Sequence, residues 1–231
     1  MGLLPKPFRA LVIGSSGTIG AAFVKLLENN PSCSLVVGIN RHSTHAIDYH
    51  LPETIELSAK SLTALEPFQL IINTIGLLHT EKYMPEKKLA DLNHAQLNEL
   101  MNVNAIGPAL TIKYFTNLLD SQNGVMAMLS AKVGSIEDNR LGGWYSYRAS
   151  KAALNMLIKT AAIELRRTKP NVAVIALHPG TVNSNLSKPF RGQEIGRNAD
   201  DAVKDMFHIL ENATKEDSGS FLSYSGEKLP W

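Results

Sequence analysis

Short apolar runs alternate with longer amphipathic stretches along this chain, and that alternation limits its possible folds more than any other feature. Apolar runs bounded by Gly, Pro, Asn or Ser predict buried strands, and stretches with helical periodicity predict helices. The predicted strands are Arg9–Ile13, Leu35–Ile39, one near Thr54–Leu57, Leu70–Asn73, Val125–Leu129, Val172–Leu177 and Ser220–Tyr224. The predicted helices are Thr18–Asn29, Asn93–Leu119, Tyr145–Thr168 and Asp200–Ala213.

Strands that alternate with helices need crossover connections, which produce a parallel sheet with helices on both faces. We therefore predict an α/β fold, a doubly wound parallel sheet of the Rossmann type. The 231 residues fit a single domain over 1–231, because chains divide into domains only beyond about 250 residues. Pro108 should kink or split the helix predicted over Asn93–Leu119. His42–Glu53 has the pattern of a loop, and its three histidines match no common metal-ligand spacing, so we predict no metal.

The charge balance argues against several classes of partner. The chain has 23 Lys and Arg against 21 Asp and Glu, a net charge of +2, which is too even to favour nucleic acid or a membrane surface. No apolar run reaches the ~18 residues of a membrane span, and Met1–Arg9 holds no apolar core of signal-peptide length. Cys33 is the only cysteine, which excludes an intramolecular disulfide and fits a reducing compartment. We expect a cytoplasmic protein.

The first predicted strand runs directly into a glycine-rich loop, Gly14-Ser15-Ser16-Gly17-Thr18-Ile19-Gly20, and a predicted helix follows. Gly14 permits a tight turn, Gly17 lets a pyrophosphate approach the backbone, and Gly20 lets the helix pack against the sheet. The N–H groups and the positive dipole end of that helix favour phosphate. Glycines also simply make turns, but between a first strand and a first helix this pattern favours a dinucleotide site.

The end of the second predicted strand indicates which dinucleotide binds. NAD sites usually place Asp or Glu there, to accept hydrogen bonds from the ribose 2′-OH. This chain has Asn40-Arg41. Asn40 does not repel a 2′-phosphate, and Arg41 can pair with it through a planar, charge-assisted fork. We predict a preference for NADP(H) with NAD(H) as the second choice; the alternative is an ordinary exposed arginine.

A tyrosine and a lysine stand four residues apart in a predicted helix, so Tyr147 and Lys151 share one face. A phenol has a pKa near 10, and a nearby ammonium lowers it, which would let Tyr147 act as an acid or base near neutral pH. This spacing also arises by chance. Two residues strengthen the hypothesis: Ser130 ends a predicted strand at the ligand-binding edge of the sheet, and Asn104 lies in a predicted helix that its amide disfavours.

Together these motifs resemble the short-chain dehydrogenase/reductase family in its one-domain branch, and the resemblance covers nearly the whole chain. Six motifs occur in the family's order: Gly14–Gly20, Asn73-Thr74-Ile75-Gly76, Asn104, Ser130, Tyr147 with Lys151, and Pro179-Gly180-Thr181-Val182. Within the family, three further segments are similar to the C-factor and Sniffer-like carbonyl reductases. They are Gly76–His79, Pro85–Lys87 and Ser223–Trp231.

The resemblance implies a role for each motif. Tyr147 would exchange a proton with the carbonyl oxygen, Ser130 would hydrogen-bond that oxygen, and Lys151 would lower the Tyr147 pKa and bind the nicotinamide ribose. Asn104 would hold a water that links Lys151 to solvent. Asn73–Gly76 would line the adenosine side, Pro179–Val182 the nicotinamide carboxamide, and Glu56 with Leu57 would contact adenine.

Two motifs depart from the family's usual pattern. The glycines follow G-x-x-G-x-x-G, whereas the one-domain branch more often has G-x-x-x-G-x-G, and Thr18 stands at its usual middle glycine. Thr74 and Ile75 replace the middle residues of a usual Asn-Asn-Ala-Gly. The bulkier Ile75 would narrow the adenosine side, and we expect neither change to abolish binding.

The sequence thus predicts an NADP(H)-dependent oxidoreductase that interconverts a carbonyl and an alcohol on a small or medium organic substrate. The alternative is an NADP(H)-binding signalling or redox-sensing protein with little turnover, which the intact catalytic residues disfavour without excluding. Three variable segments should border the substrate pocket: His79–Lys88, Ile136–Gly143 and Asn183–Arg197, with Leu141, Trp144, Leu186 and Phe190 as apolar contributors. The two longest predicted helices commonly pair between subunits in the family, so a homodimer and a monomer both stay open.

Overall fold

The structure is a computed structural model, and it describes residues 2–231. Six strands form one parallel sheet in the spatial order β2-β1-β3-β4-β5-β6. The strands are β1 Phe8–Ile13, β2 Cys33–Ile39, β3 Leu70–Asn73, β4 Gly124–Leu129, β5 Val172–His178 and β6 Phe221–Ser223. The chain runs from β1 outward to β2 and returns to β3 on the other side of β1. The connections therefore diverge at the carboxyl ends of β1 and β3, where a doubly wound sheet leaves a crevice for a ligand.

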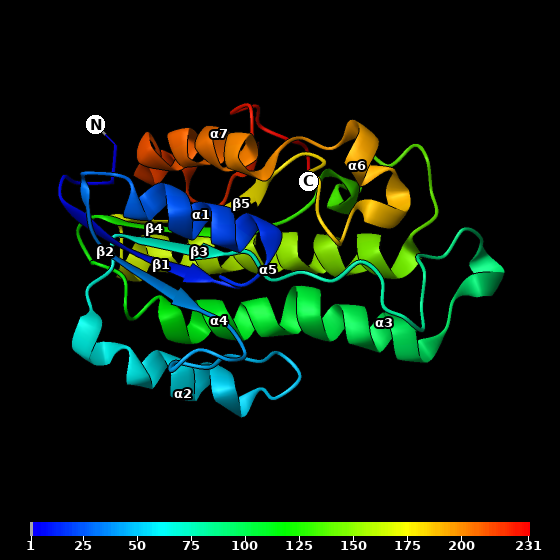
Figure 1. Ribbon diagram of the computed structural model, residues 1–231, viewed down its shortest axis with the longest axis horizontal. Helices are drawn as coiled ribbons and strands as arrows, with labels where there is room; N and C mark the ends of the chain where they lie inside the picture. The colour runs from blue at the N-terminus through cyan, green and yellow to red at the C-terminus, as the bar shows by residue number, and fades with distance from the viewer. Residues whose placement is uncertain (1) are drawn as a thin grey trace.

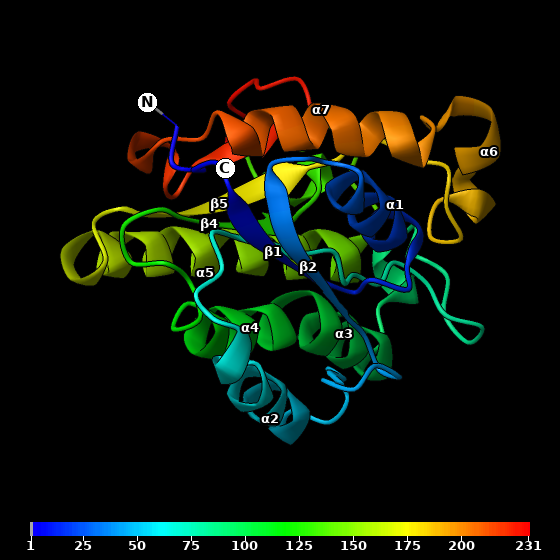
Figure 2. The ribbon, with the colours of Figure 1, turned by 60° about the vertical axis from the view of Figure 1, so that its left-hand side comes forward.

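The helices lie in two layers, one on each face of the sheet (Figure 1). They are α1 Thr18–Glu28, α2 Glu53–Ser61, α3 His94–Met101, α4 Gly107–Phe115, α5 Tyr145–Thr168, α6 Gly192–Ile195 and α7 Ala199–Glu211. In Figure 2, α1 and α7 pack together above the sheet, and α3, α4 and α5 lie below it. The outermost helix, α2, packs against α4.

Alternate residues of the central strands supply two separate hydrophobic layers. In β1, Leu11 and Ile13 pack toward the layer of α4 and α5, whereas Ala10 and Val12 pack toward α1 and α7. Strands buried on both faces read as continuous apolar runs rather than as alternating ones. That is why the strand pattern was visible in the sequence, and all six of these predicted strands are confirmed with ends that differ by at most two residues.

The strand predicted near Thr54–Leu57 is wrong, because this segment belongs to helix α2. Ile55 and Ala59 are buried one helical turn apart, whereas Leu57 is 60% exposed. Glu53 and Glu56 occupy the first turn, where the helix dipole favours acidic groups. The four-residue window suited a strand, but the wider spacing of the buried positions is helical. The sheet consequently has six strands.

The helix predicted over Asn93–Leu119 is interrupted at the place that Pro108 indicated. It divides into α3 and α4, with a π-helical turn over Asn102–Ile106 between them. Pro108 has no N–H to donate to the carbonyl four residues earlier, which belongs to Asn104. Single π turns of this kind recur at functional sites in helices. The interruption therefore frees backbone groups around Asn104 from regular helical hydrogen bonding.

Two general properties of the described chain bear on function. Within residues 2–231, no helix combines the length and apolarity that a bilayer crossing requires. Over the same residues, no three His, Cys, Asp or Glu side chains gather closely enough to hold a metal ion.

Candidate active site

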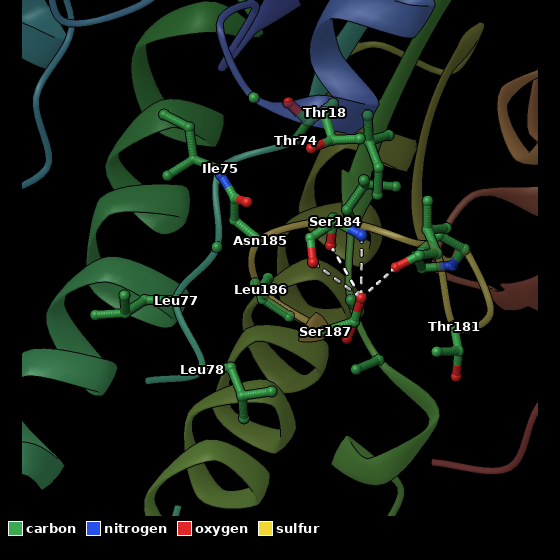
Figure 3. A pocket seen from close by; sticks show the side chains of 18 of the residues that line it. Thr18, Thr74, Ile75, Leu77, Leu78, Thr181, Ser184, Asn185, Leu186 and Ser187 are labelled. Atoms are coloured by element: carbon green, nitrogen blue, oxygen red, sulfur yellow. Dashed lines mark hydrogen bonds between the residues drawn. The ribbon is translucent and has the colours of Figure 1, made fainter. Parts of the chain in front are cut away.

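A cleft of about 940 Å³ opens along the carboxyl ends of the strands, where the sheet topology leaves room for a ligand. Its walls come from the glycine loop, from the segments after β3, β4 and β5, and from the start of α5. Figure 3 shows Thr18 and Thr74 at one end of this cleft and Leu78, Leu186 and Ser187 nearer the other. A second recess of about 320 Å³ adjoins it beside Asn40, Arg41, Asp48 and Tyr49.

The glycine loop forms a tight bend between β1 and α1. Gly14 has φ +86°, and a Cβ on Gly20 would lie 2.1 Å from the Gly14 carbonyl oxygen, so both positions exclude larger residues. A Cβ on Gly17 would meet only that same oxygen, at 3.4 Å. Gly17 caps the N-terminus of α1 with no side-chain hydrogen bond of its own. The loop therefore presents open backbone to the cleft in front of a helix N-terminus, which suits a phosphate group.

The two residues after β2 have different surroundings. The Asn40 amide is used within the protein, since Nδ2 donates to Ser15 Oγ (3.0 Å) and Oδ1 accepts from the His42 N–H (2.8 Å). Arg41 is exposed and lines both the cleft and the recess. Asn40 thus ties the glycine loop to the end of β2, whereas the Arg41 guanidinium lies where a ligand phosphate can reach it.

The adenosine side differs from the expectation in one respect. Glu56 and Leu57 lie on the outer surface of α2, and Glu56 pairs with Lys60 (2.6 Å), so the structure does not bring either to the cleft. The loop residues Asp48 and Tyr49 line the recess in their place. Glu56 was expected at the adenosine side because Thr54–Leu57 was predicted as a strand that would end at this edge of the sheet, whereas the segment is helical.

The segment Asn73–Gly76 runs from β3 along the floor of the cleft. The Asn73 side chain is buried and points away from it, with Nδ2 donating to the Tyr49 hydroxyl (2.9 Å). Thr74 Oγ1 donates to the Ile13 carbonyl oxygen (2.9 Å) and so holds this segment against the glycine loop. Ile75 and Gly76 line both cavities. Asn73 therefore supports the recess indirectly, through Tyr49.

Three of the four predicted catalytic residues converge on one wall of the cleft. Ser130 directly follows β4, and Tyr147 and Lys151 lie one turn apart at the start of α5. All three line the cleft and are buried, with Tyr147 at 7% exposure. The Lys151 ammonium nitrogen donates to the Leu129 carbonyl oxygen (3.0 Å) and lies 5.9 Å from the centre of the Tyr147 ring.

The pKa values of this pair depart from the expectation that the spacing raised. Burial raises the pKa of the Tyr147 phenol above its ordinary value. Burial also lowers the pKa of the Lys151 ammonium to about 8. The Lys151 ammonium group donates its hydrogen bond to the Leu129 carbonyl oxygen rather than to Tyr147. Its charge therefore lowers the Tyr147 pKa by less than the loss of hydration raises it. In the protein alone, Tyr147 is therefore a protonated phenol at neutral pH.

Asn104 lies behind this wall, fully buried in the π-helical turn. Its Oδ1 accepts from the Leu77 N–H (2.8 Å), and its Nδ2 donates to the Leu77 carbonyl oxygen (2.7 Å) and to Ser150 Oγ (3.0 Å). A methyl group on Gly76 would come within 3.5 Å of Lys151 Nζ and 3.6 Å of Asn104 Oδ1. Asn104 thus joins the segment after β3 to α5 close to the Lys151 ammonium group.

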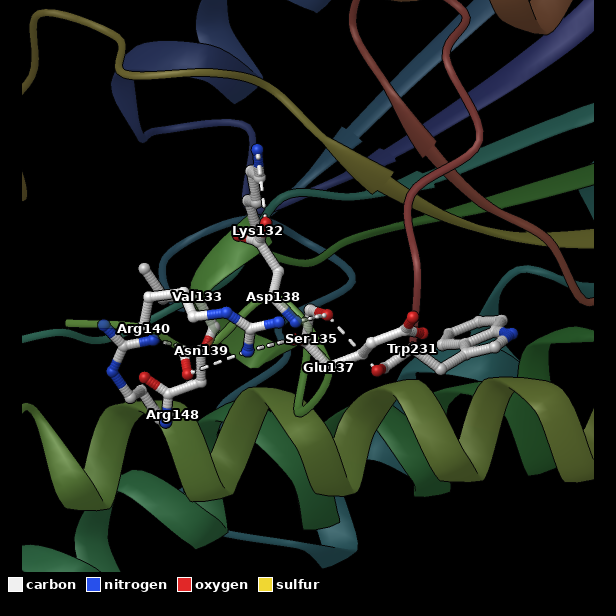
Figure 4. A network of polar contacts seen from close by, with 9 residues as sticks. All are labelled: Lys132, Val133, Ser135, Glu137, Asp138, Asn139, Arg140, Arg148 and Trp231. Atoms are coloured by element: carbon white, nitrogen blue, oxygen red, sulfur yellow. Dashed lines mark hydrogen bonds and ion pairs between the residues drawn. The ribbon is translucent and has the colours of Figure 1, made fainter. Parts of the chain in front are cut away.

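The N-terminus of α5 is held by two side chains whose contacts with this helix the sequence did not predict. The carboxylate of Glu86, 2% exposed, accepts from both the hydroxyl and the backbone N–H of Ser146, and the Glu86 carbonyl oxygen accepts from the Trp144 N–H. Arg148 donates to the carbonyl oxygens of Gly143 (3.0 Å) and Val133 (3.2 Å). Figure 4 shows Arg148 reaching from α5 into the segment after Ser130. Together these bonds fix the helix start that carries Tyr147.

The end of the cleft beyond Tyr147 is apolar and aromatic. The centre of the Trp144 ring lies 6.1 Å from that of Tyr147 and 4.9 Å from that of Phe190. The centre of the His79 ring lies 5.8 Å from that of Phe190. Leu186 joins this wall from the same loop as Phe190. Leu141, which was expected here, is 93% exposed and does not line the cleft. The bend at Gly142 and Gly143 turns that side chain to the surface and leaves Trp144 as the contributor.

The loop that carries Leu186 and Phe190 is closed at its base. The Arg197 N–H donates to the Thr181 carbonyl oxygen (2.9 Å), and the Asn183 N–H donates to the Arg197 carbonyl oxygen (2.9 Å). Ser187 Oγ donates to the Val182 carbonyl oxygen (2.5 Å). Pro179, Gly180, Thr181 and Val182 therefore line the cleft on a backbone with little freedom.

Comparison with known proteins decides the family. Residues 9–195 match the family model described as short chain dehydrogenase. The protein belongs to the short chain dehydrogenase family. A 1-hydroxy-2-glutathionyl-2-methyl-3-butene dehydrogenase of Rhodococcus sp. (strain AD45) is 32% identical over 156 residues, which cover 68% of each chain. The C-signal protein of Myxococcus xanthus is 31% identical over 144 residues, 62% of this chain and 83% of that one.

A solved structure shows the same fold. The NADPH-bound carbonyl reductase from chicken fatty liver superposes with a TM-score of 0.83 at 23% identity, over 98% of this chain and 95% of that chain. The family and the Rossmann-type parallel sheet expected from the sequence are thus both confirmed. As a short chain dehydrogenase, the protein is an oxidoreductase.

Sequence reasoning missed two features of this region: the place of His178 in the cleft and the contact between Glu86 and Ser146. His178, at the end of β5, lines the cleft, and burial together with the charge of Lys132 lowers the pKa of its imidazole to about 4. It directly precedes the Pro179–Val182 motif, so its position beside that motif was an available signal. Glu86 offered only an acidic residue in a loop 60 positions before Ser146, and no local pattern joins the two.

Proposed function

We propose that this short chain dehydrogenase interconverts a carbonyl and an alcohol on a small or medium organic substrate, with NADP(H) as its preferred hydride carrier. One observation carries the proposal: Ser130, Tyr147 and Lys151 meet on one wall of a cleft whose other end is the glycine loop. A proton donor and a phosphate cradle therefore share one continuous cavity. This is the arrangement that carbonyl reduction by a dinucleotide requires.

The residues present fit a dinucleotide with a 2′-phosphate. Gly17 leaves backbone open in front of α1, and the pyrophosphate would lie there. Arg41 borders both cavities and would pair with the 2′-phosphate. Thr181 and Val182 would contact the nicotinamide end. The chicken carbonyl reductase of the same fold binds NADPH, which supports this choice.

NADP(H), when bound, supplies or accepts the hydride, and the protein handles the proton. In the reducing direction Tyr147 would donate its phenolic proton to the carbonyl oxygen, and its raised pKa keeps that proton in place until the substrate accepts it. Ser130 would donate a hydrogen bond to the same oxygen as negative charge develops. Lys151 would remain mostly charged at neutral pH, since burial lowers its pKa only to about 8.

Lys151 and Asn104 would also help Tyr147 to recover its proton from solvent. After Tyr147 gives up its proton, a phenolate beside a buried ammonium is more stable than one beside a neutral amine. Asn104, which approaches the same space in front of Gly76, would order a water next to that ammonium and connect it to solvent. We propose this relay for the protein on the strength of the packing between Asn104, Gly76 and Lys151.

The lining of the cleft beyond Tyr147 supports an uncharged, largely apolar substrate. Trp144, Phe190 and Leu186 form its walls, and His79 adds a polar edge through its contact with the Asn185 carbonyl oxygen (3.3 Å). An anionic substrate would need a cation at this end. The two lysines that line the cleft, Lys132 and Lys151, lie near the catalytic wall instead.

The test is NADPH oxidation over a panel of aldehydes, ketones and quinones, with Tyr147→Phe as the matched variant. The variant keeps the ring and its contact with Trp144 but has no proton to give, so we expect turnover to fall about 10²–10⁴-fold with unchanged NADPH affinity. If wild type and variant are equally inactive while both bind NADPH, the enzyme proposal fails. That outcome would favour the signalling or redox-sensing alternative.

A further inference from the structure

Asn155 is a buried polar residue on α5 for which neither the sequence motifs nor the proposed chemistry has a use. It lies four residues after Lys151 and eight after Tyr147, so these three side chains follow one another along a single helix face. Asn155 is 3% exposed. Its Oδ1 accepts a hydrogen bond of 2.6 Å from the Ser130 hydroxyl.

This hydrogen bond conflicts with the role proposed for Ser130. A serine hydroxyl has one proton to donate and two lone pairs to accept with. While that proton points at Asn155 Oδ1, it cannot stabilise negative charge on a substrate oxygen. Ser130 therefore needs to release Asn155 as an acceptor before it can serve the reaction.

The second half of the Asn155 amide indicates how that release occurs. Asn155 Nδ2 is buried and has no hydrogen-bond partner among residues 2–231. Buried amide N–H groups are rarely left unpaired, and those that are unpaired call for an explanation. Rotating the amide by half a turn exchanges Oδ1 and Nδ2 within almost the same shape. Nδ2 would then donate to Ser130 Oγ, and the Ser130 proton would be free to turn into the cleft.

We propose that Asn155 is a positioning residue that directs the Ser130 hydroxyl toward the substrate oxygen. With substrate absent, Asn155 Oδ1 accepts a hydrogen bond from the Ser130 hydroxyl. With a carbonyl in the cleft, the amide turns and Nδ2 donates a hydrogen bond to Ser130 Oγ. The single Ser130 proton then points at the oxygen on which charge develops. This inference rests on the proposed function, because it assigns Asn155 a part in the same carbonyl chemistry.

Asn155→Asp is the direct test, because a carboxylate of the same shape accepts from Ser130 and has no N–H to donate. We expect kcat to fall about 10²-fold, as when one donor is removed from an oxyanion site, with NADPH affinity close to wild type. The melting temperature should fall, because the new carboxylate is buried. Asn155→Leu removes both the donor and the acceptor, which leaves the Ser130 proton undirected but available. We expect a smaller loss for this variant, about 10-fold.

The decisive measurement is a double-mutant cycle with Ser130→Ala. If Asn155 acts through Ser130, then adding either Asn155 substitution to Ser130→Ala should lower kcat no further. A purely structural role would lower it by the same factor in both backgrounds, and that result would overturn the inference. A carboxylate at this position that acted instead on Lys151 would shift the pH profile even in Ser130→Ala, and that result would overturn it too.

The two proposals fail in distinguishable ways. If wild type reduces carbonyls and Tyr147→Phe does not, but Asn155→Asp keeps full kcat, then the role of Asn155 is refuted and the proposed function stands. If no carbonyl substrate supports turnover by wild type, the proposed function fails first and the inference falls with it. Should Asn155→Asp not fold, Asn155→Leu alone completes the cycle, since coupling to Ser130 is required of both.

Discussion

Replacing Lys151 by methionine should stabilise this protein near neutral pH while it removes the proposed activity. The Lys151 side chain is 3% exposed, and burial lowers its pKa from 10.5 to about 8. That difference corresponds to a cost of about 3 kcal/mol for keeping the charged form in the folded state. Methionine keeps the stem of the side chain and carries no charge.

The gain is partly offset by a lost hydrogen bond. Lys151 Nζ donates to the Leu129 carbonyl oxygen at 3.0 Å, and a hydrogen bond from a charged donor contributes about 1.5–3 kcal/mol. We therefore expect Lys151→Met to raise the free energy of unfolding by about 1 kcal/mol at pH 7. Because the folded protein binds this proton more weakly than the unfolded chain, wild-type stability rises between pH 8 and pH 10.5. The advantage of the variant should vanish over that range.

Urea unfolding of the protein without cofactor, at pH 7 and at pH 10, measures both effects. Lys159→Met is the matched control, because Lys159 lies on the same helix, is half-buried, and donates to the Gly219 carbonyl oxygen (3.1 Å). It should lose stability slightly at both pH values. The reasoning is refuted if Lys151→Met is less stable than wild type at pH 7, or if its difference from wild type is the same at both pH values.

Four further substitutions test other parts of the site. Gly17→Ala should fold normally but no longer bind NADPH in a titration, since its Cβ meets only one atom, at 3.4 Å, and would occupy the phosphate cradle. Gly20→Ala should fail to fold, because a backbone oxygen lies 2.1 Å from its Cβ. Two equally stable variants would contradict this. Arg41→Asp should weaken NADPH binding about 10–100-fold, through loss of a charged hydrogen bond, and NADH binding far less. Equal affinity of wild type for both cofactors would count against this assignment. Glu86→Ala should lower the free energy of unfolding by about 1–3 kcal/mol, because it leaves the Ser146 N–H and hydroxyl buried and unpaired; a melting temperature like that of wild type would show that this contact is unimportant.

Local patterns predicted those parts of the fold that depend on neighbours in sequence. Six apolar runs became six strands, and Tyr145–Thr168 became α5 with the same ends. The segment Thr54–Leu57 failed for a local reason as well, because four residues are too few to separate a period of 2 from one of 3.6. The buried set of α2, with Ile55 and Ala59 one turn apart, needed a wider window.

The candidate site shows the same difference between local motifs and contacts made by distant residues. Tyr147 with Lys151, the glycine loop and Arg41 were found because each motif is contiguous or spaced by one helical turn. The contacts that aim these groups join distant positions: Glu86 with Ser146, Asn73 with Tyr49, and Ser130 with Asn155.

By itself, the sequence determined the alternation of strands and helices, the family, and the residues that carry the proposed chemistry, because each is written in adjacent residues. Only the tertiary structure decided which loop replaces Glu56 at the recess, which carbonyl takes the Lys151 hydrogen bond, and where the Ser130 proton points. Those features depend on which segments meet at the carboxyl edge of the sheet. Segments meet there through packing between residues tens of positions apart, and no local period or motif encodes that packing.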